Sequence, residues 1–278
     1  MSWYKKILIM IAILVIGIVA FLFFKKSSSG YVLVISWWWS KGAYALWVMK
    51  WLEELGIKDK IKAVYGVSAG AIVWAYRSAW YSADDIYTEY VKLFDTSIDK
   101  IHLIPKTSLF KTAPIKTAFE KDLPTTFTWC KIPLYIWAVN LYTPEFMLFS
   151  TGNLIEPLLG SMAVPWFFDP VPYQDMLLID GWSINNFPTD LAKKQYPHDR
   201  IIGIVLGKFQ TNQHPTNFID TFFIWCDILM DAQLTDKLSL ADDLFYKDLP
   251  ANRLNKSASY FATMFQQWYQ DCLDHFQK

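Results

Sequence analysis

Residues 61–78 read IKAVYGVSAGAIVWAYRS, in which two apolar runs flank a serine set between glycines. The run IKAVY predicts a buried strand, GVSAG a sharp turn, and AIVWAYRS a helix. The turn matches the pattern G-x-S-x-G, with Ser68 at its centre and Gly66 and Gly70 at its ends. Glycines at these positions allow a tight turn, and the start of the following helix favours negative charge near Ser68. The stretch therefore predicts a nucleophile elbow in an α/β protein.

Apolar segments alternate between strand-like and helix-like spacing along the rest of the chain. Further strands are expected at residues 31–36, 132–141, 145–150, 176–180 and 200–207, and further helices at 40–55, 82–94, 216–234 and 256–275. Strands that are apolar throughout and alternate with helices indicate a mostly parallel sheet covered on both faces. We therefore expect a three-layer α/β/α domain over residues 31–278.

The first 30 residues differ in character from the rest. Residues 7–24, ILIMIAILVIGIVAFLFF, are apolar and uncharged, and two lysines flank them on each side. As a helix this segment would extend about 27 Å, close to the hydrocarbon thickness of about 30 Å. A cleaved signal peptide would have a shorter apolar core and a small-residue cleavage site. We therefore expect residues 1–30 to be a single-pass membrane anchor with its linker. The balanced lysines leave the orientation open, with a cytoplasmic domain slightly favoured.

Charge and cysteine content argue against several classes of protein. Lys and Arg together number 26, and Asp and Glu together also number 26. The chain therefore has no excess of positive charge that would suggest a nucleic-acid partner. Three cysteines without metal-ligand spacing suggest buried thiols rather than a disulfide framework or a zinc site. We expect no metal, no cofactor and no nucleic-acid partner.

A serine nucleophile needs a base and donors for an oxyanion. An α/β-hydrolase triad in the order Ser, Asp, His would be satisfied by Ser68, Asp180 and either His198 or His214. In that fold, however, several strands normally precede the elbow, whereas here only one other domain strand is expected before it. All four histidines, which include His102 and His275, lie in loop-like or helix-flanking sequence typical of surface residues. The other possibility is a dyad of Ser68 and Asp180.

The chain resembles the patatin-like phospholipase family over nearly all of residues 31–275. That family has a strand, a G-G-G-x-[R/K]-G loop, a helix, a G-x-S-x-G elbow and, further along, a D-G-[G/A] turn. Residues 36–42, SWWWSKG, match the loop except at its three glycines, and Asp180-Gly181-Trp182 matches the aspartate turn. AVNLYTPE at residues 138–145 resembles the family's A-T-D-L-x-T-G-E, with Asn140 and Pro144 departing from it.

The resemblance implies a membrane-anchored serine lipid acyl hydrolase of the phospholipase or lysophospholipase type. Ser68 would be the nucleophile and Asp180 the base of a dyad that works through an acyl-enzyme. The implied oxyanion loop comprises Trp37, Trp38, Trp39, Lys41 and Gly42, and the implied aspartate turn comprises Gly181 and Trp182. The expected partners are a lipid acyl ester and the bilayer, near which the anchor would hold the site. A catalytically inactive membrane scaffold of the same fold is the alternative.

Two apolar segments have no place in the family motifs. HLIPKTSLF at residues 102–110 and NFIDTFFIWC at 217–226 could line an acyl pocket or contact the membrane. Core packing is the simpler expectation for both.

Where the family pattern has glycine, this sequence repeatedly has tryptophan. The positions concerned are Trp37, Trp38, Trp39, Trp47, Trp74, Trp80, Trp166, Trp182 and Trp268. The chain has 11 glycines and 14 tryptophans, and reading these nine as glycine gives 11 + 9 = 20 glycines in 278 residues, near the usual content of about 7%. We infer that UGA encodes glycine in this gene. The written sequence would then come from translation with a genetic code in which UGA encodes tryptophan. The remaining tryptophans, Trp3, Trp51, Trp129, Trp137 and Trp225, have no such assignment. A genuine tryptophan cluster would instead place them together on one exposed surface.

Overall fold

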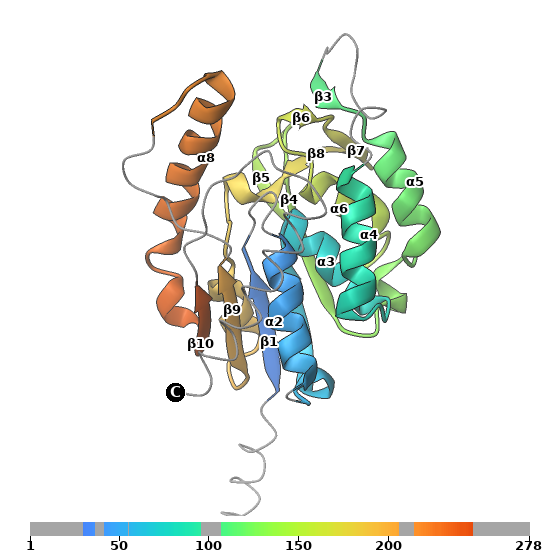
Figure 1. Ribbon diagram of the computed structural model, residues 1–278, viewed down its shortest axis with the longest axis vertical. Coiled ribbons are helices and arrows are strands. Elements are labelled where there is room, and N and C mark those ends of the chain that lie inside the picture. The colour runs from blue at the N-terminus through green and yellow to red at the C-terminus, as the bar shows by residue number, and fades with distance from the viewer. Residues whose placement is uncertain (1–29, 37–41, 55, 96–106, 206–213, 247–278) are drawn as a thin grey trace, which may run out of the picture.

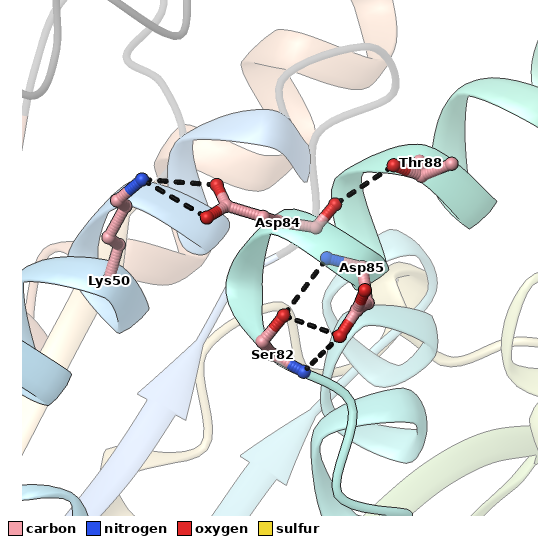
Figure 2. Close-up of polar contacts among 5 residues, drawn as sticks. All are labelled: Lys50, Ser82, Asp84, Asp85 and Thr88. Atoms are coloured by element: carbon pink, nitrogen blue, oxygen red, sulfur yellow. Dashed lines mark hydrogen bonds and ion pairs between the residues drawn. The ribbon is translucent and has the colours of Figure 1, made fainter.

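The computed structural model describes residues 30–36, 42–54, 56–95, 107–205 and 214–246 (Figure 1). The predicted anchor, most of the implied oxyanion loop and the helix expected at residues 256–275 lie outside these ranges. Across the ranges described, no helix is both long enough and apolar enough to cross a membrane.

The described residues form a mixed α/β fold in which helices surround a central sheet (Figure 1). The strands are β1 (Tyr31–Ile35), β2 (Ile61–Gly66), β3 (Ser108–Phe110), β4 (Leu134–Asn140), β5 (Glu145–Phe149), β6 (Trp166–Phe168), β7 (Val171–Tyr173), β8 (Met176–Asp180), β9 (Arg200–Val205) and β10 (Asp243–Tyr246). The α-helices are α2 (Gly42–Glu54), α3 (Ala69–Ser78), α4 (Ala83–Asp95), α5 (Ala113–Asp122), α6 (Ile155–Ser161), α7 (Thr189–Gln195) and α8 (Phe218–Leu234). The 3-10 helices are η2 (Lys58–Lys60), η3 (Phe127–Trp129), η4 (Gly181–Ser183) and η5 (Leu238–Leu240).

The central sheet is mostly parallel, as the sequence predicts. Its strand order is β10-β9-β1-β2-β4-β8-β7, and β5 pairs with β4 as an eighth strand. The run from β10 to β4 is parallel, whereas β5, β8 and β7 pair antiparallel with their neighbours. Residues 32–35 of β1 are fully buried one after another, which requires cover on both faces because successive side chains point to opposite faces.

Two neighbouring residues of β2 show which helices provide this cover. A Cβ added to Gly66 would lie 2.9 Å from the backbone nitrogen of Ala71, so this position faces α3. The hydroxyl of the next residue back, Tyr65, donates to Gln195 Oε1 of α7 at 2.6 Å. Because adjacent strand residues point to opposite faces, α3 and α7 cover opposite faces of the sheet.

Strand β4 brings the ends of two other strands together. Its residues 136–140 pair with β5 along one edge, so β2 and β8 must share the other edge. On that edge Gly66 of β2 lies opposite Ile136, and Asp180 of β8 lies opposite Ala138. Strands β2 and β8 run toward each other along this edge. Their last residues lie opposite β4 residues that are two positions apart, which corresponds to about 7 Å along the strand. The elbow after β2 and the aspartate at the end of β8 therefore meet at the carboxyl edge of the parallel strands.

The long apolar elements expected within the described ranges are confirmed to within about three residues at each end. The short elements β3, β6, β7, α5, α6 and α7, together with β10, were not expected from the sequence. The departure from the family pattern at Asn140 is accommodated in the β4–β5 turn, where its Oδ1 accepts the backbone N–H groups of Tyr142 and Leu177, each at 3.2 Å.

Candidate active site

Ser68 has the strained backbone of a nucleophile elbow. It caps the N-terminus of α3 with φ 52° and ψ −125°, in the left-handed half of conformational space that serine rarely enters. Glycine is required at position 66, because a Cβ there would lie 2.9 Å from the backbone of Ala71. A Cβ at Gly70 would lie 3.0 Å from Ile35 Cγ2, a tight contact that Ile35 would have to relieve. The sharp turn thus depends above all on the absence of a side chain at Gly66.

A buried hydroxyl on α6 holds this turn. The backbone N–H of Ser68 donates to Ser161 Oγ at 3.0 Å, and Ser161 is fully buried. The bond joins residues 93 positions apart and satisfies an N–H group that the strained turn leaves unpaired within its own helix. Ser161 is therefore part of the site, although no sequence motif assigned it a role.

Asp180 lies fully buried at the end of β8. Its Oδ1 accepts the backbone N–H of Trp182 at 3.2 Å, and its own N–H donates to the Ala163 carbonyl at 3.0 Å. The next residue must be glycine, because a Cβ at Gly181 would lie 2.6 Å from the carbonyl oxygen of Trp137 on β4. Backbone contacts with β4 and with the turn thus fix the carboxyl group of Asp180.

Burial raises the pKa of Asp180 well above its usual range. Hydrogen bonding from the Ser68 side chain and from the N–H groups of Trp182 and Gly181 opposes this increase without cancelling it. Oδ2 accepts no hydrogen bond of normal geometry from any described residue. The Ser68 hydroxyl lies close to the carboxyl group but does not form a hydrogen bond of normal geometry with it. A buried carboxylate beside a serine hydroxyl, with a raised pKa and a free lone pair, has the properties of a general base.

Neither described histidine competes with Asp180 for this role. His198 lies two residues before β9, whose first residue Arg200 pairs with Tyr31, the first residue of β1. It therefore lies at the amino edge of the parallel strands, about 20 Å along the sheet from the carboxyl edge where Ser68 lies. His214 is exposed ahead of α8, and His102 and His275 lie outside the described residues.

The remaining residues of the predicted site are only partly described. Gly42 is the first residue of α2, whereas Trp37, Trp38, Trp39 and Lys41 lie outside the described residues. Within the described ranges, no group of three or more His, Cys, Asp or Glu side chains is placed to hold a metal ion.

Two of the described tryptophans that the sequence assigns as glycine have a backbone conformation that suits glycine. Trp80 and Trp166, both at family glycine positions, have φ of 77° and 70°, which glycine adopts freely and a bulky residue rarely adopts. Trp137, which has no glycine assignment, is fully buried, and its indole donates to the Asn185 carbonyl at 2.7 Å as a native tryptophan would.

The described tryptophans are also not gathered on one surface. Trp80 is exposed at the amino edge beside Lys131, whereas Trp166 is exposed against Phe222 of α8. Trp74 and Trp182 are buried. This distribution argues against a single exposed tryptophan cluster. The side chain of Trp47 and all of Trp268 lie outside the described part of the chain.

Comparisons with known proteins agree with this geometry. The family model for patatin-like phospholipase matches residues 40–193, more than half of the chain. The probable lipid hydrolase 463L of Invertebrate iridescent virus 6 is 26% identical over 188 residues, which cover 56% of this chain and 61% of the viral protein.

Two solved structures are similar at low identity. VipD from Legionella pneumophila has a TM-score of 0.46 at 12% identity, covering 87% of this chain and 67% of VipD. ExoU, in its complex with SpcU from Pseudomonas aeruginosa, has a TM-score of 0.40 at 16% identity, covering 90% of this chain and 60% of the other. The family match includes the elbow at Ser68 and the turn at Asp180, and the chain belongs to the patatin-like phospholipase family.

Proposed function

We propose that the protein is a membrane-anchored serine lipid acyl hydrolase in which Ser68 and Asp180 form a catalytic dyad. The observation that carries the proposal is the meeting of the two residues at the edge of β4. There the strained Ser68 lies beside a fully buried carboxyl group whose pKa is raised. Membership of a phospholipase family and the name of the viral relative support a lipid ester as the substrate.

In the first half of the reaction, Ser68 Oγ attacks the ester carbonyl carbon while Asp180 accepts the hydroxyl proton. The carbonyl oxygen becomes an oxyanion, which the backbone N–H groups of residues 37–39 would stabilise with help from Lys41. The C–O bond to the alcohol then breaks, and Asp180 returns its proton to the departing oxygen. In the second half Asp180 takes a proton from water, and the resulting hydroxide attacks the carbonyl carbon of the acyl-enzyme. The bond from that carbon to Ser68 Oγ then breaks, Asp180 returns the proton to Ser68 Oγ, and the fatty acid leaves.

The raised pKa of Asp180 suits both halves of this reaction. Both halves begin with Asp180 removing a proton, and a carboxylate with the ordinary pKa of about 3.9 is a weak base toward an alcohol or water. Burial moves the pKa toward the working pH, where a single group exchanges protons most efficiently in both directions.

The proposal is tested by ester hydrolysis in detergent micelles with the full chain carrying the natural residue at each of the nine assigned positions. The substrates are phosphatidylcholine, lysophosphatidylcholine and a short-chain p-nitrophenyl ester. We expect Ser68→Ala to abolish the acyl-enzyme and Asp180→Asn to lower kcat by about 10²-fold to 10⁴-fold, the usual contribution of a general base. His198→Ala and His214→Ala serve as controls and should retain nearly full activity. If a histidine variant were inactive, the Ser–Asp–His triad would replace the dyad.

A catalytically inactive scaffold is favoured by one observation, which is that Ser68 is only 2% exposed. A lipid ester needs open space at the nucleophile, and the buried indole of Trp182, two residues after Asp180, fills space in the aspartate turn. If position 182 is glycine in the natural protein, that space is open and the enzyme is favoured. If the natural protein carries glycines at the assigned positions and still hydrolyses no ester, the hydrolase proposal is wrong.

A further inference from the structure

The outward face of α8 is apolar, which is the reverse of an ordinary surface helix. Phe218, Trp225 and Ile228 are 80%, 49% and 47% exposed. Their spacing of seven and three residues places them on one face of the helix. Core packing, the simpler expectation for this segment, is therefore correct for buried residues such as Cys226 but wrong for Phe218 and Trp225.

The charged residues of α8 lie on its other side. Asp220, Asp227 and Asp231 follow one another at intervals of seven and four residues, about half a turn away from Phe218 and Trp225. Asp227 is buried, and Asp220 lies in the first turn of the helix, where its carboxylate accepts the N–H of Thr216 at 3.1 Å. The outward face thus carries apolar and small polar side chains without a formal charge.

α8 is attached directly to the segment that follows the catalytic aspartate. Gln233 Oε1 accepts the N–H of Asn186 at 2.8 Å. The ring of Phe222 lies 5.6 Å from that of Phe167 in β6. Figure 1 shows α8 at the β10 edge of the sheet, with its N-terminal half extending past the end of β10. Because β10 runs parallel to β2, the end that carries Phe218 reaches toward the carboxyl edge, where Ser68 lies.

The predicted anchor joins the domain at the opposite edge. Strand β1 begins at Tyr31 on the amino edge, about 20 Å along the sheet from the elbow. The linker of residues 25–30 has a reach of at most about 20 Å, so an anchor alone would keep the active site near the bilayer without turning it toward the lipid. A second contact on the Ser68 side would supply that orientation.

We propose that the outward face of α8 (Phe218, Trp225 and Ile228) docks on a lipid surface and turns the active site toward its substrate. Exposed Trp and Phe on an uncharged helix face suit the boundary between headgroups and acyl chains. No lysine or arginine lies on α8, so the expected surface is zwitterionic or neutral rather than anionic. The inference rests on the proposed function, because it takes the substrate to be a lipid.

Photocrosslinking tests the contact without requiring catalysis. The full chain, with Phe218 replaced by p-benzoylphenylalanine, is reconstituted into phosphatidylcholine vesicles, irradiated and analysed by mass spectrometry. The matched control carries the same probe at Trp129, which is 73% exposed and lies in η3 before the first residue of β4. We expect lipid adducts at position 218 and few at 129. Adducts mainly at 129, or crosslinks from 218 to residues 247–278 or to a second copy of the chain, would overturn the proposal.

Activity provides the second test. We expect the double variant Phe218→Ser, Trp225→Ser to hydrolyse phosphatidylcholine in vesicles about tenfold more slowly, as expected when partly buried aromatic contacts are lost. Hydrolysis of a dissolved short-chain ester should stay unchanged, as should both activities of Trp129→Ser. Equal losses on both substrates would show that the face supports the fold rather than a lipid contact. No loss on vesicles would show that the face is not used. Either result contradicts the docking. If the protein hydrolyses no ester at all, the proposed function fails, while the crosslinking result still decides the contact.

Discussion

Ser68 is held in a conformation that costs about 1–3 kcal/mol in an unconstrained chain. The start of α3 and the hydrogen bond to Ser161 offset this cost. The sequence could predict the elbow because its pattern is local, with two glycines and a serine within five residues. It could not predict Ser161, because that contact depends on how α6 packs against the turn.

Removing the Ser161 hydroxyl should loosen the elbow. We expect Ser161→Ala to lower the free energy of unfolding by about 1–3 kcal/mol, because the buried N–H of Ser68 loses its acceptor. Misplacement of the nucleophile should lower kcat with little change in KM. Calorimetry and ester kinetics measure the two effects, with the exposed Ser239→Ala as the control. A variant with reduced stability but unchanged kcat would show that Ser161 supports the fold without positioning the nucleophile.

The raised pKa of Asp180 predicts opposite effects on activity and stability. The protonated carboxyl group cannot act as a base, so kcat/KM should fall as the pH drops through the raised pKa of Asp180. This decrease should occur at a higher pH than the value near 4 that an ordinary carboxyl group would give. Between the unfolded pKa of about 3.9 and the folded value, the folded state binds more protons than the unfolded state. Stability therefore decreases as the pH rises through this window, and the ionised carboxylate is a net cost above it.

Asp180→Asn should accordingly raise the Tm near neutral pH while removing activity. The gain should shrink toward zero below about pH 4, where Asp180 is protonated in both states. Thermal unfolding of both proteins across this pH range measures the difference. A gain that did not change with pH would attribute the effect to packing rather than to the buried charge.

At the level of elements, the active site arises from strand ends rather than from any one motif. The strands were predictable because buried parallel strands are apolar throughout, and the long helices because they are periodic. The arrangement of β2 and β8 on the same edge of β4 was not predictable, because register depends on pairing between distant segments. Short elements such as α6 and β6 are too brief to show a period of their own.

The contact between β4 and the turn after β8 can be tested by adding one methyl group. We expect Gly181→Ala to cost about 1–3 kcal/mol of stability, because its Cβ would lie 2.6 Å from the Trp137 carbonyl in a packed interior. Activity should fall further, since the resulting shift displaces Asp180. Ser239→Ala, at an exposed position in the 3-10 helix η5, is the control. Unchanged activity in Gly181→Ala would show that the position of Asp180 does not depend on this turn.

Across the whole molecule, the tryptophans decide whether the fold is an enzyme or a scaffold. Trp80 and Trp166 occupy backbone conformations that suit glycine, in regions far apart on the structure. Genuine tryptophans would be under selection for separate local reasons at each position. A reassigned codon explains all nine with one rule and also restores the usual glycine content.

Mass spectrometry of the natively produced protein tests this rule directly. The tryptic peptide of residues 27–41, SSSGYVLVISWWWSK, is bounded by lysines and contains all three loop positions. We expect three glycines at 37–39, which would free backbone N–H groups for an oxyanion. A chain made with glycine at all nine positions should then hydrolyse lipid esters, whereas the chain made with tryptophan should not. Three tryptophans in the native peptide would reject the codon assignment and, because bulky side chains crowd the loop, would favour an inactive membrane scaffold over the hydrolase.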